Sequence, residues 1–307
     1  HKKRIATLKL VTRLAIIQPT VFQQQLTDRQ DDMVKLLSCV EDKNEEIIEH
    51  FVKFISILVN KSPDFQQIIC FNIMGRLADL ISPSKMYVMD AIYSILDGNK
   101  NNQKMFVDAG YLKKLIDLVQ LSDDSVFSLL TMIFTDEENA RELGESLAAS
   151  GIVQIVMENA IKNEQRIKNL ELLGIIVHEN EKVCEIVSQR LDSFVAMYTN
   201  DKLLREQLTK FFINYLTDID ISTASMAKSI ATAYKRNQVP VLFDLCTLSI
   251  LCNPKSKSCF DEFFASAIVP IGNSIPPALR FAVSLCFKYA KACDYFIDES
   301  QAAVTKL

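Results

Sequence analysis

The stretch that decides the fold is residues 101–135, which read NNQKMFVDAGYLKKLIDLVQLSDDSVFSLLTMIFT. Asn101-Asn102 can cap a short first helix over 103–108, because asparagine side chains accept hydrogen bonds from the first amides of a helix. Gly110 follows at a sharp corner, where it can take a positive φ. A second helix then carries apolar residues on one face, and Ser122-Asp123-Asp124 caps a third. The stretch therefore predicts a unit of three short helices.

The third helix of this unit recurs along the whole chain. One anchor residue marks each copy, and successive anchors are 35 to 43 residues apart. The anchors are Leu14, Ile57, Ile95, Ile133, Ile176, Tyr215, Ile250 and Leu285. The residue after the anchor is apolar in every copy, so each third helix has an apolar stripe. A helical period near 40 residues, with a glycine at the first corner, resembles the armadillo repeat more than the two-helix HEAT unit.

We therefore predict an all-α fold, a right-handed armadillo/HEAT-like solenoid of about seven three-helix repeats. Residues 1–307 are expected to form a single armadillo-like domain with one continuous core, in which Ile95, Ile133 and Ile176 are buried. The register loosens after Asp218, where small residues replace large apolar ones, and it returns from Val239 onward. Both ends of the chain lie inside repeats, so we expect it to be a fragment of a longer protein.

Composition limits the classes of partner. The net charge is −4, from 34 basic and 38 acidic residues, which does not favour a nucleic-acid partner. The only basic run, Lys2-Lys3-Arg4, is read as a solvated helix end. No apolar run approaches the ~18 residues that a membrane-spanning helix needs, so we expect no transmembrane segment.

The eight cysteines do not have the spacing of a metal site. Cys246, Cys252 and Cys259 are 6 and 7 residues apart, Cys286 and Cys293 are 7 apart, and no Cys-x-x-Cys occurs. We expect buried free thiols, with no bound metal and no disulfide. Reduced cysteines favour a cytoplasmic protein.

Residues suited to catalysis are few. The three histidines are His1, His50 and His178, and none falls in a recognisable catalytic motif. We therefore expect no enzymatic activity and no cofactor.

A binding surface can be placed on the third helices. If the anchor and the residue four before it face the core, the positions one and five before the anchor lie together on a neighbouring stripe. Most of these positions hold small or polar residues, which suits either a protein-binding groove or a merely solvated face. The candidate partner-binding residues are Asp90, Ser94, Ser128, Glu171, Lys210 and Asn214. The chain has no tryptophan, which argues against an importin-type groove for basic peptides, and its mixed charge does not favour a catenin-like groove.

Several blocks are more specific than a generic repeat. They are Ser62–Ile69 (SPDFQQII) with Met74 and Leu77, the Asn102–Phe106 segment (NQKMF), Val239-Pro240, Phe264-Ala265-Ser266, Leu279–Val283 (LRFAV) and Cys286-Phe287. In order and spacing they resemble the globular head of the general vesicular transport factor family, Golgi tethers with an armadillo-like head and a long coiled-coil tail. The segment 181–232 shows no such match.

The resemblance implies a peripheral protein of the Golgi or of transport vesicles. Its head would bind a Rab-class small GTPase, SNAREs or other tethering factors, and would form a homodimer. Two other classes of protein stay open: the regulatory armadillo domain of a formin-type cytoskeletal protein, which binds a Rho-class GTPase, and a chaperone adaptor. Heptads after Leu307 would favour the tether, and a proline-rich run would favour the formin.

Overall fold

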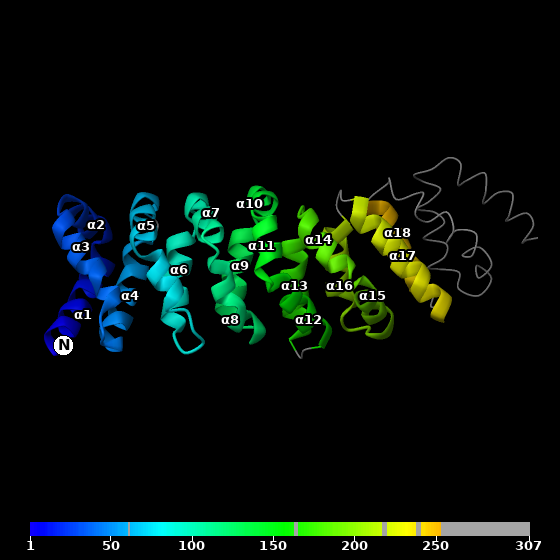
Figure 1. Cartoon of the computed structure of the whole chain (residues 1–307), viewed down its shortest axis with the longest axis horizontal. Helices are drawn as coiled ribbons and strands as arrows, with labels where there is room; N and C mark the ends of the chain where they lie inside the picture. The colour runs from blue at the N-terminus through cyan, green and yellow to red at the C-terminus, as the bar shows by residue number, and fades with distance from the viewer. Residues whose placement is uncertain (61, 163–164, 217–219, 238–240, 253–307) are drawn as a thin grey trace, which may run out of the picture. The chain divides into compact units, whose positions relative to one another are not determined.

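The computed structural model describes residues 1–60, 62–162, 165–216, 220–237 and 241–252 (Figure 1). All regular secondary structure in these ranges is helical, and no strand occurs in them. This confirms the all-α, armadillo-like solenoid class, while the number of repeats stays a prediction. The chain divides into two compact units, residues 1–155 and 156–307. Whether 1–307 forms one domain also stays a prediction.

The first unit contains the first thirteen elements and the start of the fourteenth. They are α1 (Lys2–Ile17), α2 (Pro19–Asp28), α3 (Gln30–Leu37), η1 (Ser38–Glu41), α4 (Glu45–Leu58), α5 (Pro63–Asp79), α6 (Met86–Leu96), α7 (Lys100–Asp108), η2 (Tyr111–Leu115), α8 (Ile116–Gln120), α9 (Asp124–Phe134), α10 (Glu137–Glu142), α11 (Gly144–Ser150) and α12 (Ile152–Lys162). The predicted third helices are α1, α4, α6 and α9, and each packs against the next. In Figure 1 these four helices follow one another in chain order, with α2, α5 and α7 above them in the view.

The second unit continues with the same alternation. Its elements after α12 are α13 (Arg166–Val177), α14 (Glu181–Ser188), α15 (Leu191–Asn200), α16 (Arg205–Leu216), α17 (Asp220–Asn237) and α18 (Leu242–Cys252). The third helices α13 and α16 pack together, and α16 also contacts α18. Small residues over 220–237 form one long helix, α17, where the sequence predicted a loosened register.

Repeats differ in how their outer helices are divided. Two helices were expected between α4 and α6, but α5 runs through Pro63–Asp79 as one helix of 17 residues. Gly75 lies within it, and a Cβ there would be 3.0 Å from Oη of Tyr111, so glycine permits the close approach of η2. Between α9 and α13 there are instead three helices, α10, α11 and α12. The three-helix description therefore holds only on average.

Local capping fixes many of the helix starts. Asp123 accepts a hydrogen bond from the amide of Ser125, as the sequence predicts, and Asn44 accepts from the amides of Glu46 and Ile47. Gly110 has a φ of 77°, which confirms the predicted corner, and Gly151 forms a second corner with a φ of 87°. Glycine avoids the clash that a Cβ causes in this left-handed region.

The predicted cap of α7 is displaced. Asn99 is the N-cap, and its side chain accepts from the amide of Asn102. Asn102 is instead buried, and its Nδ2 donates to the carbonyl of Ile95 at 2.9 Å. The carbonyls in the last turn of a helix have no partner within it, so a buried one needs an outside donor. That need explains why Asn102 points inward.

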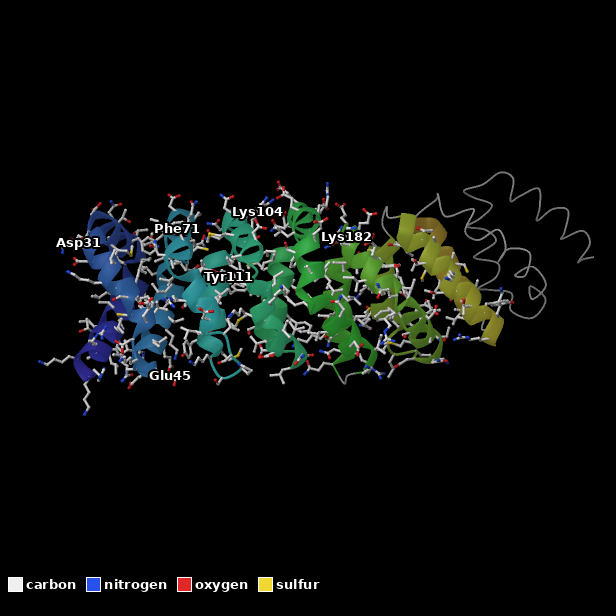
Figure 2. All side chains as sticks on the ribbon, viewed as in Figure 1. Asp31, Glu45, Phe71, Lys104, Tyr111 and Lys182 are labelled. Atoms are coloured by element: carbon white, nitrogen blue, oxygen red, sulfur yellow. The ribbon has the colours of Figure 1, made fainter. Side chains whose placement is uncertain are left out.

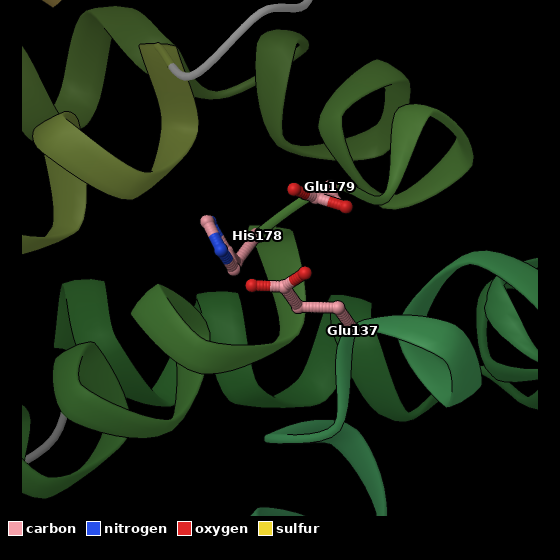
Figure 3. A group of neighbouring side chains, drawn as sticks. All are labelled: Glu137, His178 and Glu179. Carbon is pink, nitrogen blue, oxygen red and sulfur yellow. The ribbon is translucent and has the colours of Figure 1, made fainter.

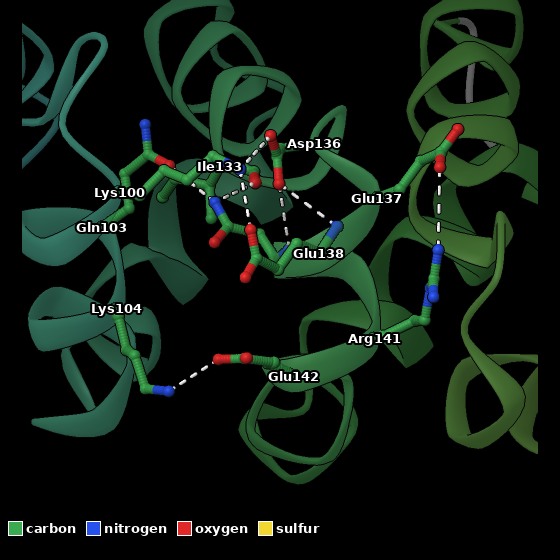
Figure 4. Close-up of polar contacts among 10 residues, drawn as sticks. Lys100, Gln103, Lys104, Ile133, Asp136, Glu137, Glu138, Arg141 and Glu142 are labelled. Carbon is green, nitrogen blue, oxygen red and sulfur yellow. Dashed lines mark hydrogen bonds and ion pairs between the residues drawn. The ribbon is translucent and has the colours of Figure 1, made fainter.

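A network of buried amides extends this arrangement between repeats (Figure 4). Gln103 donates to the carbonyl of Leu96 at 2.9 Å. Asn139 donates to Oε1 of Gln103 at 2.6 Å and to the carbonyl of Ile133 at 3.0 Å. Because Gln103 and Asn139 are both buried, the network fixes α10 against α7 and the end of α9.

Exposed ion pairs run beside the buried network. Nζ of Lys100 lies 2.9 Å from carboxylates of both Asp136 and Glu138, and Nζ of Lys104 lies 2.6 Å from Glu142 (Figure 4). Lys100 and the amides of Asn139 and Glu138 lower the pKa of Asp136. These pairs join the same two helices, but as exposed pairs they contribute little to stability.

The core confirms most anchors and moves two of them by one residue. Ile95, Ile133 and Ile176 are at most 1% exposed, as predicted. Leu14 is 47% exposed, however, and its neighbour Ala15 is fully buried. In α4, Leu58 is fully buried and Ile57 only half-buried. Both members of each pair are apolar, so the pattern could not distinguish them. The side chain of Ile250, and all of Leu285, lie outside the described residues.

Cysteines of the described part are buried, as predicted, except for half-buried Cys252. Burial raises the pKa of Cys70 and of Cys184 to about 12, so both thiols stay protonated near neutral pH. Cys259, Cys286 and Cys293 lie outside the described residues, as does the expected helix from Pro277.

No single helix in the described ranges is both long and apolar enough to cross a membrane. Only α1 and α2 taken together reach the required length and composition, and a bend of 118° separates them.

Candidate functional site

The candidate site in the first unit lies on the exposed stripe of the third helices. Asp90 and Ser94 are on α6, one turn apart, and Ser128 is on α9. Asp90 and Ser128 are exposed, and Ser94 is half-buried. The structure therefore places all three at the surface, on neighbouring packed helices, as the periodicity predicts.

The serine hydroxyls of this stripe bond to their own helices. Oγ of Ser94 donates to the carbonyl of Asp90 at 2.8 Å, and Oγ of Ser128 donates to the carbonyl of Asp124 at 2.9 Å. Each hydroxyl proton is thus used internally, as is common for serine within a helix. The stripe consequently offers a partner few hydrogen-bond donors.

In the second unit the candidate residues lie on α13 and α16. Glu171 and Lys210 are exposed, and Glu171 contributes to raising the pKa of Lys210, after the larger effect of Glu206. Nζ of Lys210 lies 2.9 Å from Oε1 of Glu206, one turn earlier on α16. The structure therefore places Glu171 and Lys210 close enough for their opposite charges to interact.

Asn214 has a structural contact that the sequence did not indicate. Its Nδ2 donates to the carbonyl of Gly174 at 3.0 Å, across the interface of α13 and α16. A Cβ at Gly174 would be 3.6 Å from the Cα of Phe211, an ordinary van der Waals contact, so α13 and α16 pack directly against each other here. Because the amide is already committed, Asn214 contributes less free surface than Glu171 or Lys210.

The shifted register adds residues that the sequence reasoning missed. With Ala15 and Leu58 as anchors, the position one before the anchor is Leu14 in α1 and Ile57 in α4. The position five before it is Leu10, which is 57% exposed, and exposed Lys53. The stripe is therefore more apolar on α1 and α4 than the sequence predicted. The signal that could have shown this is that apolar residues lie all round α1, so that some of them must be exposed.

Figure 3 shows three side chains of the types that ligate metals, Glu137, His178 and Glu179. Glu137 begins α10 in the first unit, whereas His178 and Glu179 follow α13 in the second. Within the second unit these residues supply one imidazole and one carboxylate, fewer than the three or four protein ligands of a typical zinc site. Neither unit alone forms a metal site from these three residues.

A small hollow of about 110 Å³ lies in the second unit between α15, α17 and α18. It exists because α17 presents small residues where other helices have large ones. Its lining residues are Asp192, Ala196, Thr199, Asn200, Ser229, Thr232, Ala233, Arg236 and Leu242. The lining mixes hydroxyls, an amide and one charge of each sign, without an arrangement that indicates a reaction.

Comparison with known proteins gives one relative among curated sequences. The chain is 28% identical over 135 residues to the intracellular protein transport protein Uso1 of Saccharomyces cerevisiae. The match covers 40% of this chain and 8% of the length of Uso1. The chain matches no protein-family model.

Solved structures extend the likeness in fold to nearly the whole chain. A crystal structure titled Uso1-2 matches with a TM-score of 0.72 and 14% identity, covering 94% of this chain and 59% of the other. An engineered protein matches with a TM-score of 0.56 and 11% identity, over 88% of this chain and 72% of its own. The chain thus resembles the head of a vesicle tether, and it spans only part of the proteins that it matches.

Proposed function

We propose that this chain is a non-enzymatic protein-binding scaffold, part of a tethering factor in membrane traffic between the endoplasmic reticulum and the Golgi. The observation that carries the proposal is the local identity to an intracellular transport protein, which agrees with a fold likeness over most of the chain. A solenoid suits this role because it holds several binding positions at fixed spacing on one long surface.

The proposed partners are a Rab-class small GTPase, SNAREs or other tethering factors, and a second copy of the chain. The proposed location is the cytoplasmic surface of Golgi or transport-vesicle membranes. The third-helix stripe is the proposed contact face, with Asp90, Ser94 and Ser128 in the first unit and Glu171 and Lys210 in the second. Asn214 would act there by holding α16 against α13.

Binding to Rab-class GTPases tests the proposal. We would immobilise a panel of them, loaded with GTP or with GDP, and measure binding of the purified chain by surface plasmon resonance. The test variant is Glu171→Lys with Lys210→Glu, which reverses both exposed charges. Folding should change little, since exposed charges contribute little to stability. Binding to the GTP form should weaken about tenfold or more, because the charge match is reversed.

The matched control is Lys104→Glu with Glu142→Lys, which reverses an exposed ion pair on α7 and α10. Figure 2 shows Lys104 near the top of the view, above the third helix α6. This variant should bind like the wild type. Binding to no GTPase of the panel, or an equal loss in the control variant, would contradict the proposed contact.

A further inference from the structure

A row of four positions crosses the third helices of the first unit at the site one residue before each anchor. The row consists of Leu14 on α1, Ile57 on α4, Ser94 on α6 and Met132 on α9. Leu14 is 47% exposed, and the other three are half-buried. Next to Ser94, Tyr93 is 37% exposed, so an apolar surface continues across α6. Leu14, Ile57 and Met132 thus present partly exposed apolar side chains on α1, α4 and α9, beside Tyr93 on α6, which indicates a contact surface.

The polar groups around this row do not require a polar partner. Thr12 donates to the carbonyl of Leu8 at 2.7 Å, and Ser56 donates to the carbonyl of Lys53 at 2.9 Å. Ser94 and Ser128 do the same in α6 and α9. Since these donors are already satisfied, covering them with apolar side chains leaves no hydroxyl proton without a partner.

The spacing of the row selects the conformation of the partner. Packed helices lie about 8–10 Å apart. In an α-helix, residues seven apart lie on nearly the same face and are separated by about 10.5 Å. In an extended strand, residues on the same face repeat every ~6.8 Å, which lies farther below the spacing of packed helices than ~10.5 Å lies above it. A helix with an apolar residue at every seventh position therefore fits the row.

The charge along the row changes sign, which sets the direction of the partner. Helix α1 carries Lys2, Lys3, Lys9 and Arg13, together with Arg4, which is paired with Asp42, and it has no acidic residue. Helix α6 carries Asp90 and α9 carries Asp124, and neither has a lysine or arginine. A partner helix would be complementary with acidic residues over α1 and basic residues over α6 and α9.

We propose that the row Leu14, Ile57, Ser94 and Met132 binds an amphipathic helix of a partner protein, with apolar residues seven apart and its acidic end over α1. This inference rests on the proposed function only in taking the third-helix stripe as the binding face. It names the chemistry of the partner for the first unit.

The test uses fluorescein-labelled synthetic peptides of about 28 residues, long enough to be helical. The first has leucines seven apart, glutamates near one end and lysines near the other. The second has the same composition, with its leucines distributed around the helix. The third keeps the leucine spacing and has glutamine in place of every charged residue, so it tests the contribution of charge. Fluorescence anisotropy measures binding to the whole chain.

The protein variants separate the row from other exposed apolar surface. Leu14→Glu should weaken the first peptide about tenfold or more, and Leu14→Ala should weaken it less. The control is Phe71→Glu on α5, because Phe71 is 81% exposed and lies off the row (Figure 2). Circular dichroism verifies that each variant is folded.

The expected result is tight binding of the first peptide only, unaffected by Phe71→Glu. Equal binding of the first two peptides, no binding of the first, or an equal effect of Phe71→Glu would overturn the inference. Any of these three results would leave the proposed function unaffected if the wild-type chain binds a GTPase. If the wild-type chain binds the first peptide but no GTPase, the proposed GTPase partner is wrong, while the row remains supported as a site for an amphipathic helix.

Discussion

The buried side-chain amide of Asn139 should contribute several kilocalories per mole to the free energy of unfolding of the first unit. It donates to Oε1 of Gln103 and to the carbonyl of Ile133, and all of these groups lie in the interior. Asn139→Ala leaves two buried acceptors without that donor. A buried group left unpaired costs about 1–3 kcal/mol, so the expected loss is about 2–6 kcal/mol in the free energy of unfolding.

A double-mutant cycle isolates the bond between the two side chains. Gln103→Ala alone also removes the donor to the carbonyl of Leu96, so it should be destabilising by itself. In the Gln103→Ala background the bond to Asn139 is already absent, and Asn139→Ala should then cost less. We expect a coupling of about 0.5–3 kcal/mol between the two changes.

Urea unfolding followed by far-UV circular dichroism measures each free energy, and hydrogen exchange locates the loss to α7, α9 and α10. The control is Lys104→Ala, which removes an exposed ion pair between the same two outer helices and should change stability little. Additive effects of the two amide changes, or a loss no larger than that of the control, would refute a cooperative buried network.

Three further predictions follow from single residues. Ile133→Ala should cost about 2–5 kcal/mol in urea unfolding, because it removes a fully buried side chain and leaves a cavity; a loss below about 1 kcal/mol would contradict the burial. Gly110→Ala should lower the stability by about 1–2 kcal/mol, because the φ of 77° is unfavourable for alanine. Gly110→Asn should lower it less in thermal unfolding, since asparagine tolerates this conformation, and equal losses would show that the backbone conformation is not the reason. The lowered pKa of Asp136 means that its stabilising effect is present above its unfolded pKa of about 3.9 and is lost as the pH falls through the folded value. The stability difference between wild type and Asp136→Asn should therefore shrink as urea unfolding is repeated at falling pH, and a constant difference would contradict it.

The exposure of the third-helix stripe was predictable for residues that are unsuited to the core. Asp90 and Ser128 are exposed because a charge or a small hydroxyl at that position gains nothing from the core, and the period places both on one face. Asn214 was also placed on the correct helix, but its bond to Gly174 could not be foreseen. That bond depends on how closely α13 and α16 approach, which the sequence of one helix does not specify.

The sequence by itself determined the helical class, the recurring third helix and the corner at Gly110. These features depend on local rules: apolar periodicity, caps, and the freedom of glycine at positive φ. Only the tertiary structure decided which member of the pairs Leu14-Ala15 and Ile57-Leu58 faces the core, and whether Asn102 caps α7 or points inward. Two adjacent apolar residues satisfy the same pattern, and an asparagine can bond in either place. Packing against a neighbouring repeat chooses between them, because it fixes where space and unpaired carbonyls remain.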